Sequence, residues 1–515
     1  MRITNKIMQN NNLANINTNK LLQDKLSTQM STEKKINRPS DDPVIAIRAL
    51  RLRSNVTEVT QYYSRNIPDA ESWLNVTEEA VKNLASIVTE MQKQCTKGSN
   101  GDIKTSDRLI VIEQLKALAD EVYSTGDADY AGRYVFTGYR TDTSLSFPDA
   151  TEKKYSITEQ LNKDAIEQVS FITTKGADGT SDVMDMTVNN YMTIDVKQED
   201  IQRLDVYRFH LAYGNCDEAP AELSYGTAPY STIPVTVVHD TDSPSPYEAA
   251  AAATGEQAIF VPETGELLLS KDAYETLMKT QDDPKTAGVN EGEIRITYEK
   301  TKWAKGDLRP EHYFYCTTDP GDPEKEFTYN KSYLEADKER QDIEYDVGFN
   351  QTIRVNSTAD ECFKHSIGRE VEDLVNAMQD VVDTEKIVED MKALLEKASE
   401  ADKPDIQKKL DVAQTVLNEK KGKAQRMFEH GITLMQGHLD ETNLSLTNIG
   451  TRTKKLELIE NRMQSQKTTF EELQSENEDI DIAEVIINLS SAKLTYEAAL
   501  MATGKVAQTS LLQYI

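Results

Sequence analysis

The sequence has few of the side chains that enzymes commonly use in local motifs. Its four cysteines and six histidines are dispersed over 515 residues. No CxxC pair, HExxH, Walker loop, GxSxG or GxGxxG motif occurs, and His430 and His438 lack the spacing of zinc ligands. The sequence therefore indicates no catalytic, cofactor-binding or metal-binding site, and we predict that the protein is not an enzyme.

Long apolar runs are absent as well. Mean hydropathy is −0.59, and no stretch approaches the roughly eighteen apolar residues of a membrane span. Residues 1–6 (MRITNK) do not lead into the apolar core of a secretory signal, so we expect a chain that stays in the cytoplasm or leaves by a signal-independent route. We expect no binding to membranes.

The charge is strongly of one sign. A net charge of −29 argues against nucleic-acid binding, which needs clustered Lys and Arg. Residues 1–60 nevertheless carry ten Lys or Arg against five Asp or Glu. This local excess either meets an acidic surface in an assembly or simply keeps the segment hydrated.

Both ends of the chain have the pattern of amphipathic helices. Residues 480–514 contain no proline and repeat apolar or small side chains at spacings of three and four, and residues 13–30 have a similar pattern. Chain ends usually fray, so such helices indicate a surface for another helix, in this chain or in a neighbouring copy. The candidate assembly residues are Leu22, Leu26, Met30, Ile482, Val485, Leu489, Ala492, Tyr496, Ala499, Val506 and Leu511.

A second helical block follows the breaker at residues 38–43 (RPSDDP). One of the polar residues 40–42 can cap this helix, and Pro43 suits its first turn. Helical spacing continues to residue 91, interrupted by Pro68, which we expect to kink or end the helix. Trp73 is expected in the core of this block.

The middle of the chain changes character. Residues 146–349 are rich in aromatic and β-branched residues and turn signals, with expected strands that include Met186–Val188 and Ala258–Val261. The pattern returns to helix near residue 359, and residues 383–423 have the pattern of an added helical hairpin with its loop around 401–404.

We therefore predict an α+β fold in which both chain ends form a long antiparallel, coiled-coil-like helical rod with a mostly antiparallel β insertion. A chain of this length should hold two or three domains. The expected division comprises terminal assembly helices (1–40 with 475–515), a helical rod (41–145 with 350–474) and a variable β-rich region (146–349).

The residue patterns alone leave three classes of protein open: a polymer subunit, a coiled-coil scaffold or secreted effector, and an enzyme housed in the β region. A scaffold should continue its heptads without so long a β insertion, and an enzyme should display at least one local motif. The pattern favours a polymer subunit.

Short stretches near both ends point to a family. They are residues 1–5 (MRITN), 36–43 (INRPSDDP), 48–50 (RAL), 132–138 (GRYVFTG), 350–356 (NQTIRVN), 449–457 (IGTRTKKLE), 478–484 (EDIDIAE) and 510–515 (SLLQYI). In this order they resemble the flagellin superfamily, and the resemblance covers residues 1–145 and 340–515. Pro68 and the hairpin at 383–423 depart from the family pattern.

The resemblance implies a structural subunit of the bacterial flagellum, most similar to the members that form a ring joining the hook to the filament. It implies export by the flagellar type III apparatus to an extracellular location. The implied partners are further copies of the chain, another hook-associated protein on the hook side, flagellin on the filament side and an export chaperone. Filament flagellin itself is the alternative.

Overall fold

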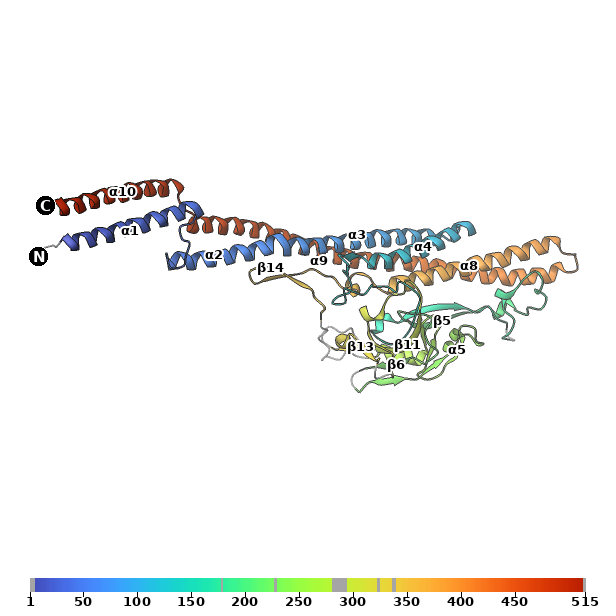
Figure 1. Ribbon diagram of the computed structural model, residues 1–515. Coiled ribbons are helices and arrows are strands. Elements are labelled where there is room, and N and C mark those ends of the chain that lie inside the picture. The colour runs from blue at the N-terminus through green and yellow to red at the C-terminus, as the bar shows by residue number, and fades with distance from the viewer. Residues whose placement is uncertain are drawn as a thin grey trace. The chain divides into compact units, whose positions relative to one another are not determined.

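The computed structural model describes residues 5–176, 179–226, 229–279, 294–321, 325–335 and 340–512. The predicted α+β class is confirmed, with long helices at both ends of the chain and largely antiparallel sheets in the middle (Figure 1). The chain forms two compact units. Unit 1 comprises Met1–Glu71, Tyr345–Ile353 and Lys454–Ile515, and unit 2 comprises Ser72–Glu344 and Arg354–Thr453.

Unit 1 is built mainly of helices. It contains α1 (Asn5–Thr32), α2 (Pro43–Gln61), α10 (Ile482–Leu512), the start of α3 (Ile67–Gly98), the end of α9 (Lys403–Glu478) and most of the hairpin of β14 (Glu344–Gly348) and β15 (Gln351–Arg354). The helices α1 and α10 pack together, as expected from the pattern at the two chain ends. Lys34 and Asp479 form an antiparallel bridge just after α1 and just before α10, so the two helices run antiparallel.

The start of α2 is set by the predicted breaker. The Asp42 carboxylate accepts hydrogen bonds from the backbone N–H groups of Val44 (2.9 Å) and Ile45 (3.1 Å), which is the role of an N-cap residue. Pro43 occupies the first helical position, where its missing N–H has no intrahelical partner to lose.

The helix does not end at Pro68. Instead, a π-turn at Tyr62–Asn66 joins α2 to α3, and the Ile67 N–H donates to the Tyr62 carbonyl. Proline has no N–H and its ring crowds the carbonyl four residues earlier. A wider turn directly before the proline relieves this conflict, so the expected interruption is present as a π-turn within a helix that continues.

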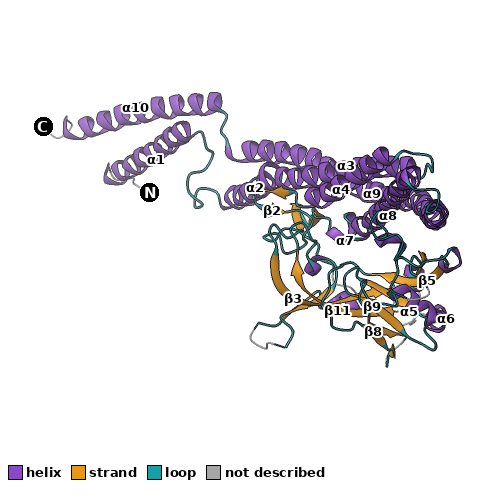
Figure 2. Ribbon diagram, turned by 90° about the vertical axis from the view of Figure 1, so that its right-hand side faces the viewer, coloured by secondary structure: helices purple, strands orange, loops and turns teal. Residues whose placement is uncertain are grey.

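Unit 2 combines the remaining helices with the β region, and its sheets lie on one side of its long helices (Figure 2). Its further helices are α4 (Thr105–Gly126), α5 (Pro246–Ala252), α6 (Lys271–Met278), α7 (Ala359–Cys362) and α8 (Ser366–Lys397). Trp73, at 1 % exposure, lies in the helical core as predicted. The helical hairpin of α8 and α9 turns at residues 398–402.

A six-stranded antiparallel sheet has the order β13-β12-β3-β11-β6-β7, and a five-stranded sheet has the order β4-β5-β10-β9-β8, in which only the β8–β9 pair is parallel. Side chains along β11 alternate between buried and partly exposed positions for most of its length, as one covered sheet face requires. The strand bounds are β1 Asp129–Tyr130, β2 Arg133–Tyr134, β3 Thr151–Leu161, β4 Glu167–Ile172, β5 Arg203–His210, β6 Glu222–Tyr225, β7 Ser231–Ile233, β8 Val235–Val237, β9 Ala258–Val261, β10 Glu266–Leu269, β11 Ile294–Trp303, β12 Tyr315–Thr318 and β13 Phe327–Tyr329.

One expected strand is wrong. Residues 186–188 follow a 3₁₀ turn at Val183–Asp185 and pair with no strand. Val183 and Met186 are buried instead against the α8–α9 hairpin, in one apolar cluster with Val388, Met391 and further residues of both helices. The apolar side chains that suggested a strand thus cover the added hairpin.

Candidate assembly interface

The contact between α1 and α10 is an apolar seam. Leu26 of α1 and Val485 and Ala492 of α10 are buried in one cluster, with Ile480 and Leu489 packed against it. On α10 the partly or fully buried positions continue at heptad spacing through Tyr496, Ala499 and Thr503. The structure therefore places five predicted assembly residues of α10, and Leu26, at a contact within the chain.

The α1 side of this seam is partly polar. Its half-buried or buried positions are 12, 16, 19, 23, 26 and 29, again at spacings of four and three. Asn12, Asn19, Gln23 and Gln29 occupy four of them. Polar residues in such a seam reduce stability but favour one register over its alternatives. The polar seam residues therefore help to set the register of the α1–α10 pair, although they bury little apolar surface.

Many apolar side chains of these two helices point to solvent. Leu21, Ile487, Leu494 and Met501 are 67–71 % exposed. Among the predicted assembly residues, Leu22, Met30 and Ile482 are 45–49 % exposed and lie outside the seam. The side chains of Val506 and Leu511 fall outside the described residues.

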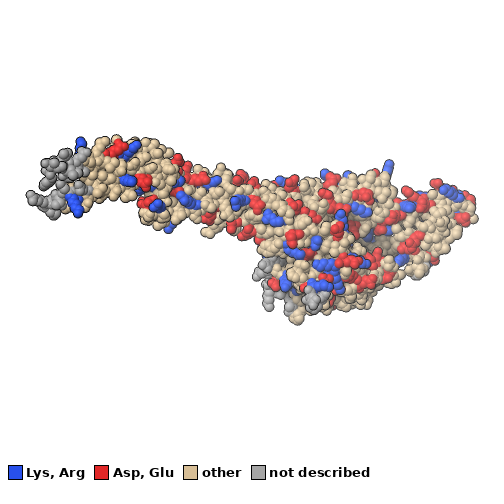
Figure 3. Space-filling view, in the orientation of Figure 1, with Lys and Arg blue, Asp and Glu red and all other residues tan. Residues whose placement is uncertain are grey.

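The same two helices carry little charge. Only eight of their 59 residues are Lys, Arg, Asp or Glu, and most of the surface of their described part is uncharged in the view of Figure 3. Surface helices of a monomer usually present charged and polar residues to water. Helices with exposed Leu and Ile and so little charge are typical of a binding surface.

Exposed apolar residues are concentrated in unit 1. Of the 26 large apolar side chains that are exposed among the described residues, 18 belong to this unit, which holds 142 of the 515 residues. Its 17 Lys or Arg nearly balance 18 Asp or Glu, whereas unit 2 has 41 against 69. Almost all of the net negative charge therefore belongs to unit 2.

A polar clamp joins the two linkers that lead into α1 and α10. The Lys35 N–H donates to the Glu478 carbonyl (2.7 Å), and the Ile480 N–H donates to the Glu33 carbonyl (3.1 Å). The Lys34 ammonium lies 2.5 Å from the Asp479 carboxylate. The two linkers thus form a short antiparallel pair at the base of the terminal helices.

Charges stabilise this clamp in their ionised forms. The pKa of Glu478 lies below its ordinary value of 4.5, chiefly because the Arg53 side chain donates hydrogen bonds to its carboxylate. The pKa of Asp479 is lowered, chiefly by a hydrogen bond from Lys34, and the pKa of Lys34 is raised by the same bond. No local sequence pattern indicates this contact, since Lys34 and Asp479 are 445 positions apart.

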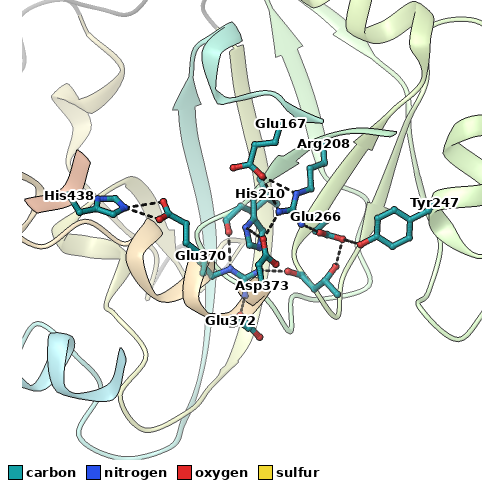
Figure 4. Close-up of polar contacts among 12 residues, drawn as sticks. Glu167, Arg208, His210, Tyr247, Glu266, Glu370, Glu372, Asp373 and His438 are labelled. Carbon is teal, nitrogen blue, oxygen red and sulfur yellow. Dashed lines mark hydrogen bonds and ion pairs between the residues drawn. The ribbon is translucent and has the colours of Figure 1, made fainter. Parts of the chain in front are cut away.

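Unit 2 contains a group of buried and partly buried charges that joins its five-stranded sheet to its helices (Figure 4). Arg208 of β5 is enclosed by the carboxylates of Glu266 on β10, Glu167 on β4 and Asp373 on α8. A carboxylate oxygen of Glu370 on α8 lies 2.9 Å from Nε2 of His438 on α9. These contacts fasten the five-stranded sheet to α8, and α8 to α9.

Within the described residues, neither a metal-ligand group nor an activated thiol is found. Within the described ranges, no group of three or more His, Cys, Asp or Glu could hold a metal ion. The four cysteines are free thiols, three of them buried and Cys216 partly so. Burial raises the pKa of Cys95 to about 12, so this thiol is not activated as a nucleophile. None of the helices described has the length and apolar character needed to cross a bilayer.

Residues 3–141 match the family model described as the bacterial flagellin N-terminal helical region. Flagellar hook-associated protein 3 of Salmonella typhimurium is 28 % identical over 168 residues, which cover 32 % of this chain and 52 % of that protein. The Escherichia coli protein of the same name is 28 % identical over 146 residues, covering 28 % and 45 %. A flagellin of Clostridium tyrobutyricum is 26 % identical over 190 residues, covering 36 % and 48 %. The chain spans about half the length of these curated relatives.

Solved structures with similarity to this chain have related names. Flagellar hook associated protein-3 of Legionella pneumophila has 8 % identity and a TM-score of 0.28, with 82 % of this chain and 98 % of that chain covered. FlgL of Xanthomonas campestris has 10 % identity and a TM-score of 0.21, with 80 % and 98 % covered. These TM-scores are too low for a functional conclusion.

Proposed function

We propose that this chain, a relative of flagellar hook-associated protein 3 that carries the flagellin N-terminal helical region, is the structural subunit joining the flagellar hook to the filament. In this role, copies of the chain form a ring. The ring binds another hook-associated protein on the hook side and flagellin on the filament side. The proposal includes no catalytic role.

The observation that carries the proposal is the concentration of exposed apolar side chains on unit 1, which has almost no net charge. Burying a half-exposed Leu, Ile or Met in a contact with another copy contributes on the order of 1 kcal/mol. With many such residues on α1 and α10, association through unit 1 is favourable without specific ion pairs.

The surplus negative charge of unit 2 complements this division of roles. Like charge on the part of each copy that does not carry the assembly helices keeps free chains soluble and apart. A near-neutral unit 1 avoids the same repulsion where copies must pack. The separation of charge thus favours association through one unit only.

The candidate interface comprises the exposed residues Leu22, Met30 and Ile482 on the outside of the α1–α10 pair. The seam residues Leu26, Val485, Leu489, Ala492, Tyr496 and Ala499 hold the pair together, and Val506 and Leu511 extend the predicted pattern. The division into terminal assembly helices, helical rod and β-rich region remains part of this proposal. Export by the flagellar type III apparatus, with the help of a chaperone, and an extracellular location belong to it as well.

A deletion strain tests the function. Cells without this chain should build hooks, lose their filaments and release flagellin into the medium, and expression of the chain should restore attached filaments. A tagged copy should mark one spot per flagellum, between hook and filament. Labelling along the whole filament, in thousands of copies, would instead identify the chain as a filament flagellin, the alternative suggested by the Clostridium relative.

A further inference from the structure

The outer face of α2 carries a basic and apolar patch that contacts within unit 1 leave uncovered. Val44, Ile47 and Leu50 are 55–65 % exposed. Arg48 and Arg51 are exposed as well. They lie beside these apolar residues, because residues three and four apart on a helix are neighbours. In the part of the chain that the structure describes, neither arginine has an ion-pair partner. We call these five residues the α2 patch.

The last turns of α9 carry the opposite charge. Glu472 and Glu476 are exposed and four residues apart, so their carboxylates share one helix face. Leu473 is exposed beside them. Neither carboxylate has an ion-pair partner among the described residues. We call these three residues the α9 patch.

The two patches lie at the same level along unit 1. The Asn477 side-chain amide donates to the Ile45 carbonyl (3.2 Å), and the Lys467 ammonium lies 5.7 Å from the centre of the Tyr63 ring. Arg53 contacts Glu478 as well, so the first half of α2 lies beside the last turns of α9.

Both patches point away from the contact between α2 and α9. On α2 the buried side chains are Ala46, Ala49 and Val59. At the end of α9, Asn477 contacts Ile45 and Glu478 contacts Arg53. The arginines of the α2 patch and the glutamates of the α9 patch are therefore exposed on the outer faces of the two helices, where a second molecule can reach each of them.

We propose that the α2 patch of one copy packs on the α9 patch of the next copy, so that successive copies join head to tail. When copies stand side by side at one level, Arg48 and Arg51 of one face Glu472 and Glu476 of the other. An interface made from two different surfaces generates a ring if the rotation between copies closes. This inference rests on the proposed function and names the contact through which the ring forms.

The charges argue against a symmetric dimer through either patch. A twofold contact would place Arg48 and Arg51 of one copy against the same residues of the other, or two glutamates against two glutamates. Like charges in close contact disfavour association. Among contacts that use one patch of each copy, the head-to-tail arrangement is the one that brings opposite charges together.

Charge reversal tests the contact in cells that lack the native chain. We expect Arg48→Glu with Arg51→Glu, and separately Glu472→Arg with Glu476→Arg, to increase flagellin in the medium at least tenfold. The chain with all four changes should restore attached filaments, because the pairs are re-formed with their signs exchanged. As a matched control, Lys104→Glu with Lys116→Glu, at exposed positions just before and within α4, should behave as wild type.

Two results would overturn the inference while leaving the proposed function intact: normal filaments with both double variants, or a fourfold variant no better than either double. Circular dichroism of the purified chains must show equal helix content, so that loss of assembly is not loss of folding. If the wild-type chain itself fails to restore filaments, the proposed function fails first.

Cysteine cross-linking on isolated flagella gives an independent reading. A chain with both Arg51→Cys and Glu472→Cys should form a ladder of covalent multimers under mild oxidation, and each single variant should remain monomeric. A covalent dimer from either single variant would show a symmetric contact and contradict the head-to-tail arrangement.

Discussion

The Arg53 guanidinium donates two hydrogen bonds to the Glu478 carboxylate, 2.7 Å from Nε to Oε1 and 2.5 Å from Nη2 to Oε2. Arg53 lies in α2 and Glu478 is the last residue of α9. This paired geometry is the most directional that a side-chain ion pair offers. It holds the end of α9 against α2 directly before the linker that leads to α10.

Replacing Arg53 by Met should loosen the base of the terminal helices. The loss of two charge-assisted hydrogen bonds should lower the free energy of unfolding by about 1–2 kcal/mol, since Glu478 keeps a second cation in Lys34 at 3.7 Å. Hydrogen exchange in the first turns of α10 should be faster in the dilute variant. Arg51→Met, at an exposed position of the same helix, serves as the control and should change neither quantity.

The same pair sets an acid response. Because the pKa of Glu478 in the folded chain is below 4.5, the stabilisation is complete above that pH and is lost as the pH falls through the folded pKa. Protection of the α10 amides should therefore fall on acidification in the wild type. The Arg53→Met chain should lose less protection over the same range, and an equal loss would contradict this role.

Two aspartate substitutions on α10 separate pairing within the chain from assembly between copies. Val485→Asp puts a charge into the seam against Leu26 and should destabilise the α1–α10 pair by at least about 2 kcal/mol. Ile487→Asp, at a 68 % exposed position, should leave the pair intact in the monomer and still prevent filament attachment. Monomer hydrogen exchange and a count of attached filaments measure the two effects. Normal attachment with Ile487→Asp would exclude this face from the interface.

Glu159 of β3 should make unit 2 less stable as the pH rises. Its Oε1 accepts hydrogen bonds from the Tyr298 hydroxyl (2.5 Å) and the Ala212 N–H (2.9 Å), while Oε2 has no hydrogen-bond partner among the described residues. Burial raises the pKa of this carboxyl to about 7. The folded chain therefore holds a proton that the unfolded chain releases above about pH 4.5, and stability falls until the folded carboxyl has ionised.

Glu159→Gln removes this titration. The free energy of unfolding of the variant, relative to wild type, should rise by about 3 kcal/mol from about pH 4 to about pH 8. Glu222→Gln, at an exposed position of β6, is the matched control and should show no such change. Denaturant unfolding at several pH values measures the difference, and parallel curves for Glu159→Gln and wild type would refute the assignment.

Met186→Ala should destabilise the α8–α9 hairpin although Met186 lies in the β region. Its buried side chain belongs to the apolar cluster with Val388 and Met391 of α8, so the truncation leaves a cavity that costs about 2–5 kcal/mol. Met192→Ala, six residues away and 67 % exposed, has the same chemistry and should cost almost nothing. Thermal unfolding compares the two. Equal midpoints would mean that this segment does not support the hairpin.

Local sequence predicted the features that neighbouring residues determine. The RPSDDP breaker and its capping residues predicted the start of α2. The expected strand Ala258–Val261 is β9, with the same bounds. Repeats at three and four residues identified α10 and its mate. In each case the preference of a few consecutive residues agrees with their tertiary surroundings.

Features that depend on distant residues were not predictable in this way. Met186 belongs to an apolar run that fits a strand, but its partners are on a hairpin about 200 positions away. The clamp of Lys34 with Asp479 has no local pattern at all. On α1 the seam uses Asn12, Asn19 and Gln23, which hydrophobic periodicity cannot identify, while leucines such as Leu21 point to solvent.

The π-turn at Tyr62–Asn66 determines how the buried face of α2 continues into α3. The buried residues Val59 and Ile67 are eight positions apart, and Ile67 and Ala70 are three apart. In an uninterrupted heptad repeat, the first of these intervals would be seven. One surplus residue is thus accommodated within a single wide turn. A helix with such a turn takes up one additional residue without rotating the buried face that follows it.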